Sequence, residues 1–302
     1  MHGERLLLDT SSLMYRAFFA LPVTITGADG RPVNAVRGYL DMCAHLVAER
    51  RPDEVVHVLD DDWRPAERVA AYPGYKAARL ADPEGLPEQF GLLGDVLAAA
   101  GQARGWAPGW EADDAIAALC ARAGAGERLA VVTGDRDLLQ LVRDDAPRVR
   151  LLFTVRGVSQ LTEFDEAAVQ ARYGVPASRY ADFATLRGDP SDGLPGVPGV
   201  GEKTACSLVA SHESIPALLA DAGALPARLR ERLGAAGDYL DAMRAVVPVR
   251  ADVEVRLDEG RRDDARLDEL ADAHRIDKPL RRLRRAAAAM AGQRRDGGRE
   301  TT

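Results

Sequence analysis

The chain has 302 residues, of which 46% are apolar, and this length allows two domains with a proper core. The net charge of −7 argues against a generic basic nucleic-acid binder, although forty Lys and Arg residues can still build a local basic face. Three distant cysteines without a CxxC pattern indicate reduced thiols and a cytoplasmic protein. No apolar run is long enough for a signal peptide or a membrane span, so we expect no membrane partner.

Three short apolar runs, each followed by acidic residues, predict buried parallel strands. Ligands in open α/β sheets bind just beyond the carboxyl ends of the strands, so these acids are expected to meet in one crevice. Such a cluster repels itself unless it holds a cation, and hard carboxylate oxygens suit Mg²⁺ or Mn²⁺. The runs are residues 5–9 ending in Asp9, residues 55–60 ending in Asp60, and residues 129–133, which lead into Asp135 and Asp137.

The remaining patterns divide the chain into two parts. Alternating apolar residues over 148–161, with Arg156 and Gly157 in the middle, predict a hairpin. From about residue 165 strand patterns fade and helical patterns dominate. Helices are predicted at residues 35–50, 88–100, 111–123, 178–187, 202–211 and 237–246. We therefore expect an α/β domain at 1–172, a helical domain at 173–278, and a basic tail at 279–302 that is disordered beyond a frayed helix.

Residues 61–90 differ in character because prolines interrupt every periodic pattern while Arg and Tyr are frequent. We interpret them as a long excursion at the edge of the site, mobile or partly helical. Aromatic side chains can stack on bases while cations hold phosphates, a pairing suited to single strands, although a solvated loop explains the composition equally well. Lys76 and Arg79 are spaced to share a helical face. The other members of the stretch are Trp63, Arg64, Arg68, Tyr72 and Tyr75.

Two acidic motifs add to the candidate metal site. Glu111, Asp113 and Asp114 open a predicted helix; acids there complement the helix dipole, but three in four positions exceed what a cap needs. Glu111 and Asp114 share a face while Asp113 points elsewhere, so the trio can serve two neighbouring ions. Asp135 and Asp137 follow a strand in a turn, where they can face one ion, although turn chemistry alone also places Asp there.

In the triplet 60–62, Asp60 ends the strand and is the favoured ligand. Tyr15 and Arg16 follow the first strand at the same crevice, where Arg16 can hold a phosphate or pair with a site carboxylate. The histidines are scattered and show neither zinc spacing nor a nucleophile triad, and His57 within a strand is expected to be a core residue.

Residues 188–204 form the most specific stretch, and their second half is typical of a helix–hairpin–helix. Glycines allow a tight turn, and the next helix presents backbone N–H groups to a phosphate without reading a base. Lys203 adds positive charge. A Walker A loop needs adjacent Gly-Lys, and the intervening Glu202 disfavours an NTPase. A plain Gly/Pro loop is a weak alternative because Thr204 leads straight into a helical pattern.

In this order the motifs resemble the 5′-nucleases, meaning flap endonucleases and the 5′→3′ exonuclease domain of bacterial DNA polymerase I. The resemblance runs from Leu6 to about residue 250, and it implies a free-standing enzyme because no polymerase domain follows. The implied fold is α/β, with a PIN-like, mostly parallel central sheet flanked by helices, a helical arch or clamp at 61–90 and a C-terminal helix–hairpin–helix domain. The motifs are Leu-Leu-Leu-Asp9 with Tyr15-Arg16, Tyr75-Lys76-Ala-Ala-Arg79, Glu111-Ala-Asp113-Asp114, Thr-Gly-Asp135-Arg-Asp137, and Gly-Asp189-Pro-Ser-Asp192 running into Gly199-Val-Gly201-Glu-Lys203-Thr204.

The resemblance also implies two divalent ions, Mg²⁺ or Mn²⁺, and K⁺ on the hairpin carbonyls. The metal ligands are assigned as Asp9, Asp60, Glu111 and Asp113 at one ion, and Asp135, Asp137, Asp189 and Asp192 at the other, with Asp114 close by. The implied catalytic cations are Arg16, Lys76 and Arg79. The implied DNA contacts are Tyr15, Arg68, Tyr75, Gly199, Gly201, Lys203 and Thr204.

Two departures from the family pattern stand out. Gly193 occupies a position where the family usually has Asn, which is expected to loosen the local turn. The spacing from Asp60 to Arg68 is one residue longer than usual, and Asp61 would restore it.

The expected function is structure-dependent 5′→3′ exonuclease and 5′-flap endonuclease action on DNA by two-metal catalysis, in replication or repair. The expected substrate is DNA with a 5′ flap or free 5′ end, and the expected partners are a DNA polymerase or other replication or repair proteins around a cytoplasmic monomer. A PIN-class ribonuclease would share the crevice without needing the helix–hairpin–helix. A non-catalytic DNA-binding module could lose its carboxylates, and a phosphatase would not need the clamp.

Overall fold

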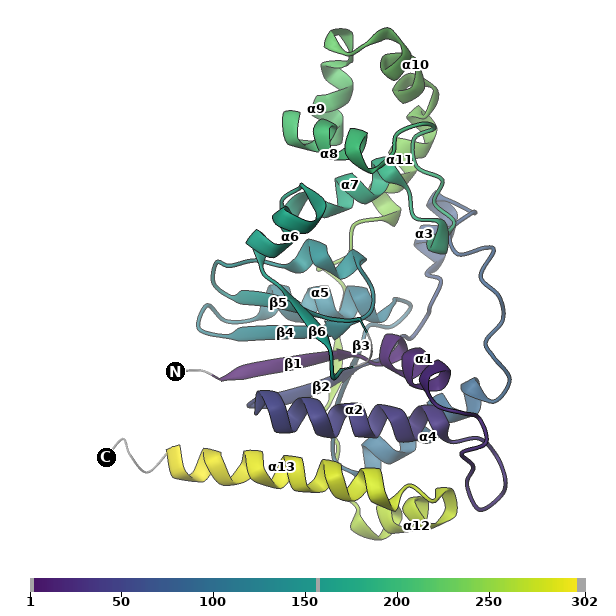
Figure 1. Ribbon diagram of the computed structural model, residues 1–302, viewed down its shortest axis with the longest axis vertical. Helices are drawn as coiled ribbons and strands as arrows, with labels where there is room; N and C mark the ends of the chain where they lie inside the picture. The colour runs from purple at the N-terminus through teal and green to yellow at the C-terminus, as the bar shows by residue number, and fades with distance from the viewer. Residues whose placement is uncertain (1–2, 156–157, 298–302) are drawn as a thin grey trace.

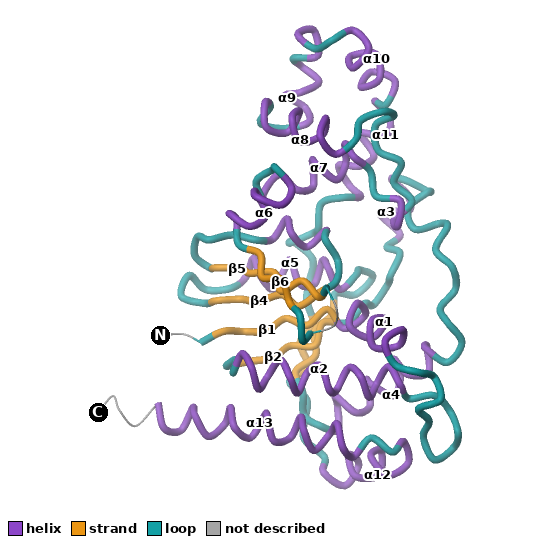
Figure 2. The backbone as a smooth tube through the Cα atoms, viewed as in Figure 1, coloured by secondary structure: helices purple, strands orange, loops and turns teal. Residues whose placement is uncertain are grey.

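The computed structural model describes residues 3–155 and 158–297, and it contains an α/β unit and a smaller helical unit (Figure 1). Within these residues the sheet has seven strands in the order β6-β5-β4-β1-β2-β3-β7. Figure 2 draws the strands in orange among the purple helices. The five central strands are parallel, and the two edge strands, β6 and β7, are antiparallel. The bounds are β1 Glu4–Asp9, β2 Glu54–Val58, β3 Ala103–Trp106, β4 Arg128–Thr133, β5 Arg148–Thr154, β6 Leu161–Phe164 and β7 Arg256–Asp258.

Helices cover both faces of the sheet, which is why the central strands are apolar throughout. Leu6 and Leu8 of β1 pack into one hydrophobic cluster, and Leu7 packs into the other. The α/β fold predicted from the apolar runs is confirmed. The helices of the α/β unit are α1 Thr10–Ala20, α2 Asn34–Arg50, α3 Ala66–Ala71, α4 Leu86–Ala99, α5 Ala112–Arg122, α12 Asp264–His274 and α13 Asp277–Gly297. Those of the helical unit are α6 Glu166–Tyr173, α7 Tyr180–Arg187, α8 Glu202–Ser211, α9 Ile215–Ala220, α10 Ala227–Ala235 and α11 Gly237–Val246.

Strands β3 and β7 were not foreseen in the sequence. Both are short and polar, so neither contains an apolar run that marks a strand. Ala103 of β3 pairs with Val56 of β2, and β7 extends the same edge. The predicted hairpin is formed by β5 and β6, which pair antiparallel. Its expected turn at Arg156 and Gly157 lies outside the described residues.

The end of the chain returns to the α/β unit, so the predicted boundary at residue 278 is wrong. After α11 the chain adds β7 to the sheet and then packs α12 against α4 and α13 against α2 (Figure 1). Ile276, Leu280 and Leu283 are buried in the same hydrophobic cluster as α2. With Ile276 directly before α13, their spacing of three and four residues makes α13 amphipathic. The tail was expected to be a frayed helix followed by disorder, whereas α13 is helical to Gly297. Residues 298–302 of that tail lie outside the described residues.

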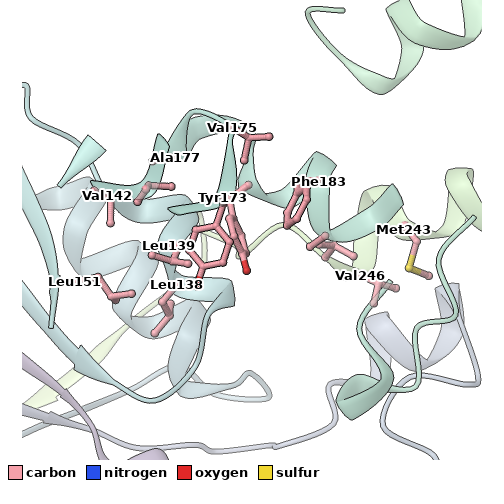
Figure 3. Close-up of a cluster of buried hydrophobic side chains, with 14 of the residues drawn as sticks. Leu138, Leu139, Val142, Leu151, Tyr173, Val175, Ala177, Phe183, Met243 and Val246 are labelled. Carbon is pink, nitrogen blue, oxygen red and sulfur yellow. The ribbon is translucent and has the colours of Figure 1, made fainter. Parts of the chain in front are cut away.

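One hydrophobic cluster joins the two units (Figure 3). It begins on β5 and the short 3₁₀ turn Asp137–Leu141 and continues into α7 and α11. A shared apolar core of this kind seats one unit firmly on the other, unlike a polar linker. The labelled side chains are Leu138, Leu139, Val142, Leu151, Tyr173, Val175, Ala177, Phe183, Met243 and Val246.

Among the described residues, no helix has the length and apolarity needed to cross a membrane.

His57 of β2 is a core residue, as expected, and lies beneath the carboxyl ends of the strands. Its side chain is 0% exposed, and its Nδ1 lies 2.6 Å from the hydroxyl of Tyr39. Burial lowers the pKa of His57 to about 4, and the charge of Arg104 adds to the effect. The ring is therefore neutral at pH 7.

We expect His57 to make the protein acid-sensitive between about pH 6.5 and pH 4. Its folded pKa lies below the unfolded value of 6.5, so the unfolded chain binds the proton first and stability falls as the pH drops through this window. The effect on the unfolding free energy is at most roughly 3 kcal/mol. Urea denaturation at pH 7.0, 5.5 and 4.5 measures it. The variant His57→Gln should lose less stability on acidification, and equal losses in both proteins would contradict the assignment.

Candidate active site

The carboxyl end of β1 places Asp9 between two neighbouring strands. The carboxylate caps α1, because Oδ1 accepts from the backbone N–H of Ser12 at 3.1 Å. Oδ2 accepts from Thr133 Oγ1 of β4 at 2.6 Å. Strand pairing puts Asp9 beside Val58 at the end of β2. One carboxylate therefore lies where three parallel strands end.

The turn after β4 is held by its own hydrogen bonds. The N–H of Asp135 donates to Thr133 Oγ1, and the N–H of Asp137 donates to Asp135 Oδ1, both at 2.9 Å. The N–H of Gly134 donates to Ser12 Oγ of α1 at 2.8 Å. Thr133 and Ser12, which sequence reasoning missed, thus fix the turn that carries two of the predicted ligands.

The structure distinguishes the three acids of residues 60–62. Asp60 accepts from Ser11 Oγ and from the N–H of Ala112 at 2.7 Å, at the start of α5. Its charge also acts on Asp9. Asp61 instead accepts a hydrogen bond from the N–H of Gly109 at 2.7 Å, and Asp62 accepts one from the N–H of Arg64 in its own loop. Asp60 is therefore the member of the triplet that lies at the crevice, despite the unusual spacing to Arg68.

Glu111 lies at the N-terminus of α5 and meets three side chains of the 61–90 segment. Its Oε2 accepts from the Tyr75 hydroxyl at 2.6 Å and also from Arg68, and Oε1 accepts from Lys76. Asp114, predicted near the metals, instead forms a two-point ion pair with Arg68 at 2.7 and 2.8 Å. Both Asp114 oxygens are engaged and the side chain is 0% exposed, so it is a buried partner of Arg68 and not a candidate ligand.

The segment 61–90 is less helical than expected from the resemblance. After the six residues of α3 the chain runs through turns and irregular backbone until α4 begins at Leu86. Lys76 has a positive φ of 50°, so Lys76 and Arg79 do not share a helical face as predicted. Both still point to carboxylates: Lys76 is buried against Glu111, and Arg79 Nη2 lies 3.2 Å from Asp192 Oδ1. Residues 72–79 are called the clamp base below.

Arg68 and Tyr75 were predicted to contact DNA, and the structure places both inside the protein. They are 2% and 4% exposed. The guanidinium of Arg68 lies 5.8 Å from the ring centroids of Tyr75 and Trp110. Arg68 and Tyr75, which were expected to contact single-stranded DNA, instead donate hydrogen bonds to Glu111.

The loop after α7 brings Asp189 and Asp192 to the same crevice, and both are 8% exposed. The clamp base docks on this loop, since the Lys76 N–H donates to the Asp192 carbonyl at 2.9 Å. Gly193 has a φ of 73°, and a Cβ there would lie 2.6 Å from the Gly74 carbonyl oxygen. The glycine departure from the family pattern thus gives room for the clamp base and does not loosen the turn.

The carboxylates repel one another in a partly dry crevice. Burial raises the pKa of Asp9 to about 7, and the charges of Asp60 and Asp135 add to the effect. Burial, with the charge of Asp135, raises the pKa of Asp113 and of Asp137 well above the usual range. These acids take their full charge at neutral pH only if a cation joins them.

The cations of the clamp base balance part of this charge. Burial raises the pKa of Asp192 to about 6, against the opposing charge of Lys76. Within residues 3–155 and 158–297 no three potential ligands already converge as a metal-binding group. Lys76 pairs with Glu111, and Arg79 pairs with Asp192. The donor set itself, made entirely of carboxylate oxygens, fits Mg²⁺ or Mn²⁺.

Arg16 and Tyr15 of α1 border the crevice. Arg16 Nη1 donates to the Val155 carbonyl at 3.1 Å, beside the turn at Gly134. The Tyr15 hydroxyl donates to Asp82, so this side chain ties α1 to the far end of the 61–90 segment. Arg16 thus lies at the predicted crevice, whereas Tyr15 is engaged within the protein.

The predicted hairpin lies in the helical unit between α7 and α8. Gly201 is the N-cap residue of α8, and none of the described side chains caps this terminus, which leaves backbone N–H groups for a phosphate. Lys203 is exposed and Thr204 half-buried on the first turn. Gly199 has a φ of 72°, and its carbonyl accepts from Arg232 Nη1 at 3.1 Å. Sequence reasoning missed Arg232, because it lies 33 residues away on α10.

A carboxylate crevice at the end of a parallel sheet, beside a helix–hairpin–helix, defines the 5′-nuclease type of fold. Comparison with known proteins agrees: residues 4–174 match the 5′-3′ exonuclease N-terminal resolvase-like domain, and residues 175–272 match the 5′-3′ exonuclease C-terminal SAM fold. The chain belongs to the 5′-3′ exonuclease family.

Individual proteins agree with this assignment. The chain is 42% identical to a 5′-3′ exonuclease of Mycobacterium tuberculosis over 97% of its own length and 100% of that protein. It is 46% identical to a 5′-3′ exonuclease of Streptomyces coelicolor over 92% of this chain and 98% of that one. The fold also matches the bacteriophage T5 D15 flap endonuclease in a complex with DNA and metal ions, with a TM-score of 0.63, 18% identity, and coverage of 94% and 99%.

We expect Mg²⁺ to stabilise this protein, and more at pH 8 than at pH 6. The pKa values of Asp9 and Asp192 are higher in the folded than in the unfolded protein, so the free energy of unfolding falls as the pH rises. A bound cation stabilises the charged carboxylates and offsets this loss of stability. At a concentration one hundred times Kd, binding adds about 2.7 kcal/mol, which raises Tm by about 4 °C for a chain of this length. Differential scanning fluorimetry with and without EDTA measures it.

The matched variants are Asp137→Asn in the crevice and Asp95→Asn, an exposed residue of α4. The first should reduce the Mg²⁺-dependent rise in Tm, and the second should leave it unchanged. An equal rise in all three proteins would place the metal elsewhere.

Proposed function

We propose that this protein is a structure-dependent 5′→3′ exonuclease and 5′-flap endonuclease that hydrolyses DNA phosphodiesters with two Mg²⁺ or Mn²⁺ ions. One observation carries the proposal: carboxylates from separate parts of the chain meet the cationic clamp base at the carboxyl ends of the parallel strands. Membership of the 5′-3′ exonuclease family supports the reaction, and the T5 neighbour in complex with DNA and metal ions supports the substrate class.

The carboxylates divide by position into two groups that would hold the ions. Asp9, Asp60, Glu111 and Asp113 lie at the ends of β1 and β2 and at the start of α5. Asp135, Asp137, Asp189 and Asp192 lie on the turn after β4 and the loop after α7. When bound, divalent ions supply an activated water and a clamp on the attacking and leaving oxygens of an in-line displacement.

The cations around the crevice orient the phosphate. When the scissile phosphate draws Lys76 and Arg79 away, Glu111 and Asp192 become free to bind the metal ions. Arg16 of α1 would add a further cation near the turn after β4. The 5′ strand would lie against residues 61–90. Cleavage in this geometry leaves a 5′-phosphate and a 3′-hydroxyl.

The hairpin at 196–204 would grip the duplex backbone through Lys203 and the first N–H groups of α8, without reading bases. Potassium at the hairpin stays an expectation of the resemblance alone, because Arg232 already places a cation on the Gly199 carbonyl. Cytoplasmic location, a monomeric state, and a DNA polymerase or repair protein as partner also belong to the proposal. Buried Cys43 and Cys120, both unpaired, support a reducing compartment.

Changing Asp135 or Asp137 to Ala should lower cleavage by roughly 1,000-fold or more, because several kcal/mol of transition-state stabilisation depend on these ligands. DNA binding should change little. The assay uses a duplex with a labelled 5′ flap, Mg²⁺ or Mn²⁺, and EDTA as the metal-free control.

The matched variant is Asp145→Ala, an exposed acid beyond the amino end of β5, which should cut like the wild type. Normal cutting by the crevice variants would refute the metal assignment. Tight binding by a wild type that cuts under neither metal would favour a non-catalytic DNA-binding module, and activity confined to RNA would favour the ribonuclease alternative.

Replacing Lys203 with Ala should weaken DNA binding by a similar factor on different sequences. A contact to phosphate carries no base information, and its loss lowers the slope of log K against log salt by about 1. Fluorescence anisotropy at several salt concentrations measures both quantities. Lys278→Ala, at an exposed residue of α13, provides the control and should keep the wild-type slope. A sequence-dependent loss would speak against backbone recognition by the hairpin.

A further inference from the structure

Arg68 of α3 is a buried cation at the inner wall of the crevice, where it lines a small cavity together with Glu111, Asp113 and Asp137. It is 2% exposed, less than any other Lys or Arg in the described part of the chain. Although burial opposes its charge, Asp114 and Glu111 raise the pKa of the guanidinium above its usual range. A charge this deep is stable only when every partner is in place, so its contacts define its role.

The guanidinium directs its N–H groups at two separate parts of the protein, the start of α5 and the exit from α11. Nη1 and Nη2 pair with Asp114 at 2.8 and 2.7 Å, and Nη1 also donates to Glu111 Oε2. Nε donates to the Val246 carbonyl at 3.0 Å, and Nη2 lies 3.4 Å from the Pro248 carbonyl. Arginine suits such a site because its donors form a rigid planar fork.

The two carbonyls belong to residues 246–250, here called the strap, which leads from α11 back to the α/β unit. The strap N–H of Arg250 donates to Asp114 Oδ1 at 2.8 Å, and the N–H of Val249 donates to Gln140 Oε1 at 3.0 Å. Gln140 lies on the 3₁₀ turn that begins at Asp137. The strap therefore touches both α5 and the turn after β4.

We propose that Arg68 is a positioning residue that sets the orientation of Glu111 and ties it to the strap of the helical unit. The start of α5 and the strap come from distant parts of the chain, and the side chain of Arg68 in α3 bonds to both. Seating of the helical unit is thereby coupled to a carboxylate of the crevice. The role of Glu111 as a ligand rests on the proposed function, whereas the mechanical link does not.

The variant Arg68→Lys tests the proposal because it keeps the charge and loses the fork. Lysine can pair with one carboxylate but cannot also hold both strap carbonyls. Supporting residues of this kind change metal affinity by roughly 10- to 100-fold. We therefore expect the Mn²⁺ titration midpoint, measured by isothermal calorimetry without DNA, to rise about tenfold with the same number of ions bound at saturation.

A second readout follows the strap itself. Hydrogen exchange of the Val249 and Arg250 amides in metal-free protein should quicken in Arg68→Lys by about tenfold or more, because the strap loses its tie to α3. Arg122→Lys is the matched control, since Arg122 donates to the Val253 carbonyl beyond the strap. It should keep both the Mn²⁺ midpoint and the exchange rates of the wild type.

Three results would overturn the inference. An unchanged Mn²⁺ midpoint with a lower Tm would make Arg68 a merely structural residue. Weaker DNA binding with an unchanged midpoint would restore it as a DNA contact. If Arg68→Lys does not fold, the variant Asp114→Asn weakens the same connection between Arg68 and the strap. Loss of a bound ion in Asp114→Asn would show that Asp114 is a metal ligand and would contradict the inference.

The two proposals fail separately. A wild type that cuts no flap substrate, together with the expected midpoint and exchange changes, would remove the proposed function and retain the link. A wild type that cuts normally, with neither change in Arg68→Lys, would remove the link alone.

Discussion

Repulsion among buried carboxylates is the constraint on which the rest of this structure depends. Parallel strands end at one edge of the sheet, so acids from distant segments collect there, and burial raises the pKa of several of them. The protein offsets part of this charge with cations of its own. Lys76 forms an ion pair with Glu111, Arg79 forms one with Asp192, and the buried Arg68 forms one with Asp114. The clamp base is therefore part of the electrostatic balance of the site.

The helical unit is built into the same arrangement. It shares a hydrophobic cluster with the α/β unit (Figure 3). Its loop after α7 supplies Asp189 and Asp192. Arg68 donates a hydrogen bond to the Val246 carbonyl at the end of α11. The chain then adds β7 to the edge of the sheet beside β3 and packs α13 against α2. A site assembled from both units keeps its geometry only while they stay seated on each other.

Family membership and the local contacts of the side chains define different properties of this protein. The match over residues 4–272 establishes the 5′-3′ exonuclease family, and the likeness to the T5 enzyme at 18% identity concerns the fold. The geometry adds what the family name does not say, namely which side chains are engaged internally. Tyr75 and Arg68 sit against Glu111, and Arg232 sits on the hairpin carbonyl of Gly199.

The sequence by itself determined the features that depend on local patterns: the apolar strands, the acids that end them, and the glycine-rich turn before Lys203. Only the tertiary structure decided the direction of the clamp cations, the internal pairing of Asp114 with Arg68, and the addition of β3 and β7 to the sheet. Arg68 and Asp114 are 46 residues apart, and Arg68 and Val246 are 178 apart. Periodicity and turn signals report a few neighbouring residues, whereas the partner of a buried charge is chosen by the packing of the whole chain.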